Sequence, residues 1–235
     1  MERLSIIIPC YNESKSLPML ISRCKEVANK DSNIEIVIVD NGSNDDTSSV
    51  LDDLISGLTF ITRVEIEVNQ GYGHGILVGL AAARGEILSW THADMQTDLG
   101  DALKGLDFFN SISNSEDLFV KGRRQGRPLA DVFFTVGMSI FETLLLRKFM
   151  WDINAQPTMF HRKFFLTWKL PPKDFSLDLY AYYMAKKSRL EVKRFPVVFA
   201  ERAHGVSSWN VSFISRYHFI KRTLLYSFGL QKRMR

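Results

Sequence analysis

The chain has 235 residues, of which 46% are hydrophobic and 24% are charged, and its formal net charge at pH 7 is +4. These values are typical of a folded globular protein and exclude an intrinsically disordered chain. The positive charge is concentrated at one end: residues 211–235 contain six Lys and Arg and no acidic residue, whereas residues 1–210 carry 24 basic and 26 acidic groups. This distribution argues against a nucleic-acid partner and predicts contact with an anionic membrane surface.

Cysteine usage and the apolar runs predict where the protein resides. Cys10 and Cys24 are too few for a disulfide framework and show no zinc-binding spacing, so we expect a reducing compartment. The N-terminus enters a strand-like run without the pattern of a signal peptide. No apolar stretch reaches about 18 residues without a charge, so we expect no conventional transmembrane helix. The prediction is a cytoplasmic protein that is peripheral at the inner face of the membrane.

Hydrophobic periodicity predicts alternating strands and helices. In chain order we expect a strand at 3–9, a helix at 14–29, a strand at 34–39, a helix from Thr47 to about Ile55, a strand at 64–68, an Ala-rich helix ending near Arg84, and a strand that stops at His92. The second half continues with a helix at 101–113, a strand at 117–121, an apolar helix over 132–146, a helix at 175–188 and a strand at 190–198. We expect the helix over 132–146 to be buried or interfacial, because it is too short and interrupted to span a bilayer.

Repeated strand–loop–helix units favour an α/β fold with a mostly parallel sheet and helices on both faces. Residues 1–210 are predicted to form one domain, and residues 211–235 a basic amphipathic helix. At 100° per residue, Phe213, Ile214, Tyr217, Ile220, Leu224, Leu225 and Phe228 share one face, and Arg216, Arg222 and Arg233 lie on the other. This helix either binds an anionic membrane or covers the core with its apolar face.

The polar loop that follows the strand at 87–90 is the first candidate site. It presents His92, Asp94, Gln96 and Asp98 at alternate positions. In an open α/β sheet, ligands bind outside the carboxyl ends of the strands, where a carboxylate can hold a divalent cation against a diphosphate. Asp94 is therefore the candidate metal ligand. The alternative is an ordinary polar turn after a buried strand.

The glycines of NQGYGHG, at 69–75, suggest a phosphate-binding loop. They have no GxGxxG register, however, and they follow the third strand instead of the first. Close backbone packing at the start of a helix explains most of them.

Four motifs together resemble those of the family 2 glycosyltransferases in order and spacing, over nearly the whole chain. They are IIIPCYNE at 6–13, VDNGSNDDT at 39–47, the Asn69-x-Gly71-x-Gly73 loop with ARGE at 83–86, and THADMQTD at 91–98. The resemblance implies a GT-A fold, a UDP- or GDP-linked sugar donor, a divalent metal (Mg²⁺ or Mn²⁺) and inverting transfer. The later segments VKGRRQGRP, DINAQPTMFHR, FSLDL and ERAHGVSSW resemble its polyprenyl-phosphate hexosyltransferase branch.

The resemblance also implies roles for the donor loops. Pro9, Tyr11 and Glu13 would frame the nucleotide, and Asp40 would contact the base or ribose. A carboxylate at a strand end can accept hydrogen bonds from base N–H groups or ribose hydroxyls. The remaining residues assigned to donor binding are Asn41, Asn69, Gly71, His92, Arg123 and Arg124.

The metal loop departs from the usual Asp-x-Asp pattern, because His92 takes the place of the first acid while Asp94 and Gln96 are kept as the metal residues. A neutral imidazole hydrogen-bonds ribose or ligates a metal without adding negative charge, so weaker Mg²⁺ binding or a preference for Mn²⁺ is expected. The alternative for His92 is a structural hydrogen bond.

Arginines and two carboxylates are the candidates for the chemistry of transfer. Arg123, Arg124 and Arg202 are in loops where the family gathers cations near phosphates, and a guanidinium pairs with phosphate oxygens bidentately. Asp178 in FSLDL is the first candidate for a catalytic base and Asp152 in WDINAQP the second. The alternative for either is to cap a helix or order a loop.

The acceptor that we expect is a polyprenyl phosphate. A phosphate monoester is already anionic, so it can attack without a strong general base. The GRRQGRP loop, the apolar helix from Val132 and the basic C-terminal end suit a charged head with an apolar chain. A saccharide hydroxyl in surface polysaccharide synthesis, or a lipid-linked saccharide, is the alternative acceptor, because the transmembrane extensions of many lipid-directed relatives are not seen.

Two other classes of protein are alternatives for this sequence. A GT-A-like nucleotidyltransferase usually has a glycine-rich first loop, which PCYNESKS lacks. A non-catalytic nucleotide-sugar-binding protein remains an alternative, because His92 replaces the first acid of the metal loop.

Overall fold

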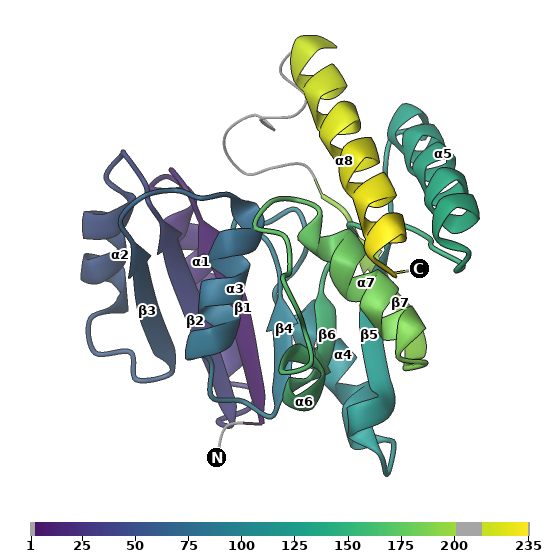
Figure 1. Ribbon diagram of the computed structural model, residues 1–235. Helices are drawn as coiled ribbons and strands as arrows, with labels where there is room; N and C mark the ends of the chain where they lie inside the picture. Colours follow the sequence, from purple (N-terminus) through teal and green to yellow (C-terminus); the bar gives the residue numbers. More distant parts are fainter. Residues whose placement is uncertain (1–2, 201–212, 235) are drawn as a thin grey trace.

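The computed structural model describes residues 3–200 and 213–234, and within the second range it describes the side chains of 220–233. A seven-stranded sheet in the order β3-β2-β1-β4-β6-β5-β7 forms the centre of the molecule (Figure 1). The strands are β1 (Leu4–Cys10), β2 (Ile34–Asn41), β3 (Ile61–Ile66), β4 (Ile87–Trp90), β5 (Leu118–Gln125), β6 (Thr158–His161) and β7 (Glu191–Val198). The predicted α/β fold with a mostly parallel sheet is confirmed.

Only β6 runs antiparallel to its neighbours within the described chain. It pairs with β4 on one side and with β5 on the other, and β5 pairs in parallel with β7. Because β6 is reversed, its first residue, Thr158, pairs with the last residue of β4, Trp90. The segment before β6 therefore reaches the edge of the sheet where the parallel strands end.

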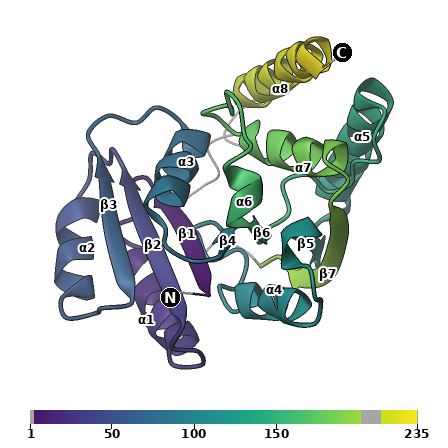
Figure 2. The same ribbon diagram turned by 60° about the horizontal axis from the view of Figure 1, so that its bottom comes forward.

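Helices cover both faces of the sheet (Figure 2). One apolar core includes side chains of α1, α2 and α4, and the other includes side chains of α3, α6 and α7. The helices are α1 (Leu17–Ala28), α2 (Thr47–Ile55), α3 (Tyr72–Ala82), α4 (Asp101–Asn110), the 3₁₀ turn η1 (Ser115–Asp117), α5 (Leu129–Leu146), α6 (Arg162–Phe165), α7 (Leu177–Lys187) and α8 (Phe213–Met234).

Two strand boundaries differ from the predicted ones. β3 begins at Ile61, three residues earlier than expected, because Ile61 pairs with Ile36 and is buried, whereas Val68 is exposed. β5 continues to Gln125 because its whole length pairs with β7. The first half of GRRQGRP is therefore strand and not loop.

α5 is longer than predicted. It begins at Leu129, directly after Pro128, and its 18 residues make it the one helix in the described chain that is long and apolar enough to cross a membrane, by length and composition. The prediction that this stretch is too short for a bilayer was therefore wrong. Only 17% of its residues are buried, so α5 is not a core helix either.

α8 packs beside α5 at the edge where the parallel strands end (Figure 1). Leu230 is fully buried in the core, and Gln231 Nε2 donates to the carbonyl of Leu145 at 2.7 Å. Leu225 and Phe228 are more than half exposed. The side of α8 that contains Ser227 and Leu230 thus covers the protein, whereas Leu225 and Phe228 of the predicted apolar face remain at the surface.

The contact between α5 and α8 contains a buried carboxyl group. One oxygen of Glu142 accepts a hydrogen bond from Ser227 Oγ at 2.5 Å, and the other has no hydrogen-bond partner within the described chain. Burial raises the pKa of Glu142 from 4.5 to about 7, against the opposing effect of the Ser227 hydrogen bond. Because the pKa is higher in the folded state, the stability linked to this group is present below about pH 4.5 and is lost as pH rises through about 7.

We predict that Glu142→Gln stabilises the protein at pH 8 by about 1–3 kcal/mol and has a much smaller effect at pH 5. Glutamine keeps an acceptor for Ser227 and removes the charge that burial disfavours. Urea unfolding at the two pH values measures the difference, with the exposed Glu67→Gln as the matched control. An equal effect of Glu142→Gln at both pH values would contradict the assignment.

Candidate functional site

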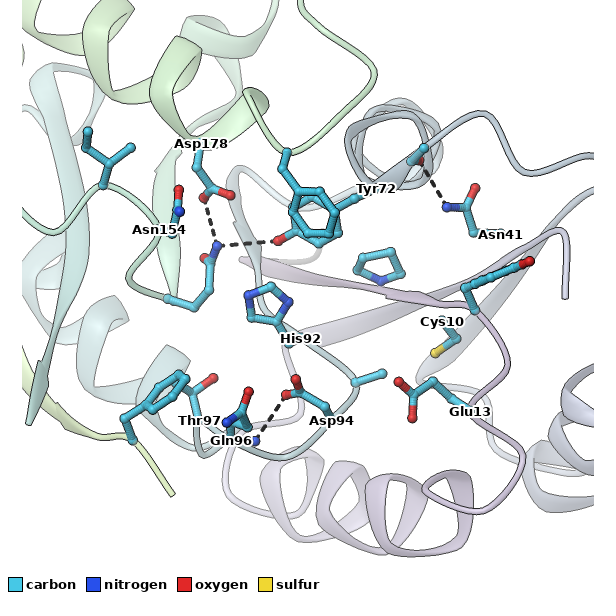
Figure 3. A pocket seen from close by; sticks show the side chains of 18 of the residues that line it. Cys10, Glu13, Asn41, Tyr72, His92, Asp94, Gln96, Thr97, Asn154 and Asp178 are labelled. Carbon is cyan, nitrogen blue, oxygen red and sulfur yellow. Dashed lines mark hydrogen bonds between the residues drawn. The ribbon is translucent and has the colours of Figure 1, made fainter. Parts of the chain in front are cut away.

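A cavity of about 1100 Å³ lies at the edge where the parallel strands end (Figure 3). The loops after β1, β2 and β4 form one side of it, and the segment before β6, the start of α7 and one side of α5 form the other. The predicted residues that line it are Pro9, Tyr11, Glu13, Asn41, Asn69, Gly71, His92, Asp94, Gln96, Arg124 and Asp178.

Three predicted residues that the structure describes do not line the cavity. The carboxylate of Asp40 accepts a hydrogen bond from the backbone N–H of Ser43 at 3.1 Å, so it orders the turn after β2. Arg123 is exposed on β5, and Asp152 is held by Arg124. Arg202 lies outside the described residues.

The loops after β1 and β2 are tied to each other. The backbone N–H of Asn12 donates to Ser43 Oγ at 3.0 Å, and that of Glu13 donates to Thr47 Oγ1 at 2.8 Å. Asp45, which the sequence analysis did not single out, also lines the cavity. Burial favours its neutral form, but hydrogen bonds from Thr47 and Ser14 lower the pKa of Asp45 below its ordinary value. These bonds fix an anionic, hydrogen-bonding rim on the β1–β2 side.

Only glycine fits at position 71. Its φ is +114°, and a Cβ at this position would lie 2.5 Å from the carbonyl oxygen of Lys173. The neighbouring amides fix the same loop, since Asn69 Oδ1 accepts from Gly71 N at 2.8 Å and Asn41 Nδ2 donates to Gly71 O at 3.1 Å. Close packing at the start of α3 is therefore confirmed for Gly71.

Three rings are stacked in the cavity. Tyr72 lies between His92, at 5.3 Å between ring centroids, and Phe175, at 4.7 Å. The stack links the loop after β4 to the segment before α7. Tyr72 was missed in the sequence, because an aromatic residue among glycines gives no signal for a partner more than 100 residues away.

Asp94 and Gln96 form a tight turn after β4. Asp94 is 5% exposed, and its Oδ1 accepts a hydrogen bond from Gln96 N at 3.1 Å. Within the described residues, no three His, Cys, Asp or Glu side chains are grouped to hold a metal by themselves. One carboxylate and one amide oxygen still suit Mg²⁺ or Mn²⁺ if substrate phosphates and water complete the coordination, which is common for Mg²⁺.

Asp178 is held by several donors at the opposite wall of the cavity. Its Oδ1 accepts from Gln156 Nε2 at 2.8 Å and from Trp90 Nε1 at 3.3 Å. The carboxylate is 2% exposed, in the first turn of α7, where the helix dipole favours negative charge. Asp178 also lines the cavity, so its carboxylate is fixed at the wall that a ligand would meet.

Arg124 and Asp152 form a buried pair beside the cavity. Arg124 Nε donates to Asp152 Oδ1 at 2.8 Å, Arg124 Nη2 donates to the same oxygen, and the Arg124 backbone N–H donates to Oδ2 at 3.0 Å. Burial would raise the pKa of Asp152, but Arg124 holds it below its ordinary value. Since both oxygens are engaged, the geometry favours the alternative role for Asp152, that of ordering a loop.

Arg127 is a second guanidinium on this wall that the sequence analysis missed. Its Nη1 donates to Thr135 Oγ1 at 2.8 Å, and both Arg124 and Arg127 lie over the ring of Phe199, at 5.4 and 5.7 Å. Both arginines line the cavity. The sequence could have identified Arg127, because it belongs to the same GRRQGRP segment as Arg123 and Arg124.

We predict that Asp152→Asn destabilises the protein by about 3 kcal/mol, because it leaves Arg124 buried without its counter-charge. Thermal or urea unfolding measures the loss, and the exposed Asp53→Asn, expected to change stability by less than about 0.5 kcal/mol, is the control. Full stability of Asp152→Asn would show that the pair does not order this wall.

Comparison with known proteins identifies the family of this chain and several relatives. Residues 5–168 match the family described as Glycosyl transferase family 2. An undecaprenyl-phosphate 4-deoxy-4-formamido-L-arabinose transferase from Enterobacter sp. (strain 638) is 35% identical over 133 residues, which cover 52% of this chain and 40% of the relative. The protein of the same name from Pseudomonas fluorescens (strain Pf0-1) is 27% identical over 225 residues, or 88% of this chain and 60% of the relative. The chain thus matches at most about three-fifths of the length of these two relatives.

A solved structure confirms the GT-A-like fold. A mannosyltransferase from Pyrobaculum calidifontis, solved in complex with GDP-Man and Mn²⁺, aligns with a TM-score of 0.68 at 19% identity. The alignment covers 94% of this chain and 64% of that chain.

Proposed function

The chain belongs to glycosyl transferase family 2 and is a glycosyltransferase enzyme, and we propose that it transfers a hexose from a UDP- or GDP-linked donor to a polyprenyl phosphate with inversion. One observation carries this proposal. A single cavity is lined by the loops after β1 and β2, by Arg124 and Arg127, and by residues of α5 and α8. It offers room for a nucleotide at one end and an anionic, partly apolar acceptor at the other.

The loops after β1, β2 and β4 bind the donor. Tyr11, Asn41, Asp94 and Gln96 all line the cavity, and we assign the first two to the base and ribose and the last two to the diphosphate and its cation. The P. calidifontis mannosyltransferase shares the fold and was solved with GDP-Man and Mn²⁺, which supports a nucleotide-sugar donor and a divalent metal. A bound Mg²⁺ or Mn²⁺ would stabilise the negative charge that develops on the leaving diphosphate.

We predict that Asp94→Ala abolishes transfer and leaves the fold intact, because the diphosphate loses the carboxylate that holds its counter-ion. Release of nucleoside diphosphate with and without Mn²⁺ measures the effect. Asp98→Ala is the matched control, since Asp98 is exposed and pairs with Arg23 instead of lining the cavity. Wild-type turnover by Asp94→Ala, or wild-type activity in excess EDTA, would refute the role of Asp94.

Arg124 and Arg127 bind the acceptor phosphate. Two guanidinium groups supply fixed donors that match phosphate oxygens, and their stacking on Phe199 restricts their motion. In the transfer, an oxygen of the acceptor phosphate forms a bond to the anomeric carbon while the bond from that carbon to the diphosphate breaks. The electron pair leaves with the diphosphate, and the ionised phosphate gives up no proton. Names of relatives that act on undecaprenyl phosphate support this class of acceptor.

Asp178 distinguishes the two acceptors. A saccharide hydroxyl needs a base for its proton, and loss of a general base typically costs about 10²–10⁴-fold in rate. With a phosphate acceptor, Asp178 is not needed to take a proton. We predict that Asp178→Asn retains measurable transfer to undecaprenyl phosphate, in an assay with radiolabelled donor. Complete loss of transfer in Asp178→Asn, together with wild-type activity on a saccharide and none on undecaprenyl phosphate, would favour the saccharide reading.

An apolar–basic surface on α5 and α8 holds the enzyme at the bilayer. Its exposed apolar side chains lie at the same end of the molecule as the cavity, and exposed Lys and Arg adjoin them. They are Leu129, Phe133, Ile140, Leu144, Leu225 and Phe228, with Arg147, Lys148, Lys221 and Lys232. Apolar side chains enter the headgroup region, and each basic residue adds about 1 kcal/mol near anionic lipid. The acceptor chain would then reach the cavity from the membrane.

We predict that the full chain floats with vesicles that contain anionic lipid, and that flotation decreases at high salt. The double variant Phe133→Glu/Leu144→Glu should not float with the vesicles. Val68→Glu, which places the same charge at an exposed apolar residue of another surface, should float as the wild type does. Equal flotation of all three proteins would exclude this surface as the membrane contact.

A further inference from the structure

A row of side chains crosses the sheet under the cavity. Strand register pairs Trp90 of β4 with Thr158 of β6, Thr158 with Lys121 of β5, and Lys121 with Arg194 of β7. Residues that pair across strands point to the same face of a sheet. Trp90 Nε1 donates to Asp178, and the Arg194 guanidinium lies over the ring of Tyr182, so this face is the one covered by α7.

Lys121 is the unusual member of this row because it is 0% exposed. Its Nζ donates to Thr158 Oγ1 at 2.6 Å and lies 3.8 Å from Asp178 Oδ1. Burying an ammonium group costs several kcal/mol, and apolar residues of similar volume are often as stable or more stable in such places. Stability alone therefore gives no reason for a lysine at this position.

The partner of Lys121 explains its presence. Asp178 Oδ1 receives hydrogen bonds from Gln156 and Trp90, and the ammonium group approaches the same oxygen. Lys121 itself does not line the cavity, whereas Asp178 does (Figure 3). The lysine thus acts on the cavity only through this carboxylate.

We propose that Lys121 is a positioning residue for sugar transfer, whose buried ammonium group fixes Asp178 as an oriented anion facing the sugar. This inference rests on the function proposed above. An anion at that place stabilises positive charge that develops on the sugar ring as the bond to the diphosphate breaks, and it accepts a hydrogen bond from a sugar hydroxyl without taking the proton. Preorganisation is the reason for two hydrogen bonds and a nearby ammonium group at one oxygen.

The charge on Lys121 depends on pH. Burial lowers the pKa of Lys121 to about 7, although Asp178 of α7 opposes this shift. Arg194 of β7 and Arg124 of β5 also lower it, and Asp152, in the segment before β6, raises it. The ammonium group is present below about pH 7 and lost above it, so the part of the rate that depends on this charge falls as pH rises through about 7.

The test compares wild-type protein with Lys121→Met, which keeps the length of the side chain and removes its charge. The measurement is kcat for transfer from UDP-glucose or GDP-mannose, whichever the wild type uses, to undecaprenyl phosphate between about pH 5.5 and 9.5. We expect Lys121→Met to lower kcat at pH 6 by roughly 10- to 100-fold, with little change in the KM of the donor. Losses of this size are typical when a residue that orients a metal ligand is replaced. The variant should also lack the decline near pH 7.

Two further variants separate positioning from folding. Lys163→Met removes an exposed lysine that pairs with Glu116, and it should match the wild type in rate and pH profile. Thr158→Val removes the acceptor that aims Nζ and should lower kcat in the same direction by a smaller factor. Lys121→Met leaves the buried Asp178 without this nearby cation and should lower stability at pH 6, so kcat is compared at a temperature below the thermal unfolding of both proteins.

Two results would overturn the inference. One is a Lys121→Met protein with the kcat and pH profile of the wild type. The other is a folded Lys121→Met protein that loses rate but keeps the wild-type decline near pH 7. Absence of transfer in the wild type itself would instead refute the proposed function, and the inference with it.

Discussion

The reversed strand β6 is the constraint on which the site depends. Because Thr158, its first residue, pairs with Trp90, the last residue of β4, the segment before β6 is delivered to the same edge as the loops that follow the parallel strands. Gln156 enters the cavity there and donates to Asp178. The close approach requires Gly122 on the neighbouring strand, since a Cβ at that position would collide with the carbonyl oxygen of Gln156.

Buried charges of both signs lie together near β5 and β6. Lys121, Asp152 and Asp178 are all nearly inaccessible to solvent there. Each is paired, as burial demands. An interior with fixed charges costs stability but needs no reorganisation when a charged ligand enters. This arrangement suits a reaction between a diphosphate-linked sugar and an anionic acceptor.

The sequence was sufficient for most of the elements and for placing Asp94 directly after a strand, because the periodicity of strands and the positions of their ends are local signals. It did not separate the four-residue strand β6. It was not sufficient for partners brought together by register. Lys121 appeared only as part of a strand, and nothing in the chain linked it to Asp178. A carboxylate that binds a ligand also has the same sequence signature as one that orders a turn, which is why Asp40 and Asp152 were not distinguished from Asp178.

The central claim is that this cavity brings a nucleotide sugar and a polyprenyl phosphate together. The most direct measurement is nucleoside diphosphate release by the full chain from a panel of UDP- and GDP-sugars with Mn²⁺, in the presence and absence of undecaprenyl phosphate. The account predicts release from one donor that depends on undecaprenyl phosphate, with the sugar recovered on the lipid. Release that is unaffected by the lipid phosphate, or no release from any donor, would contradict it.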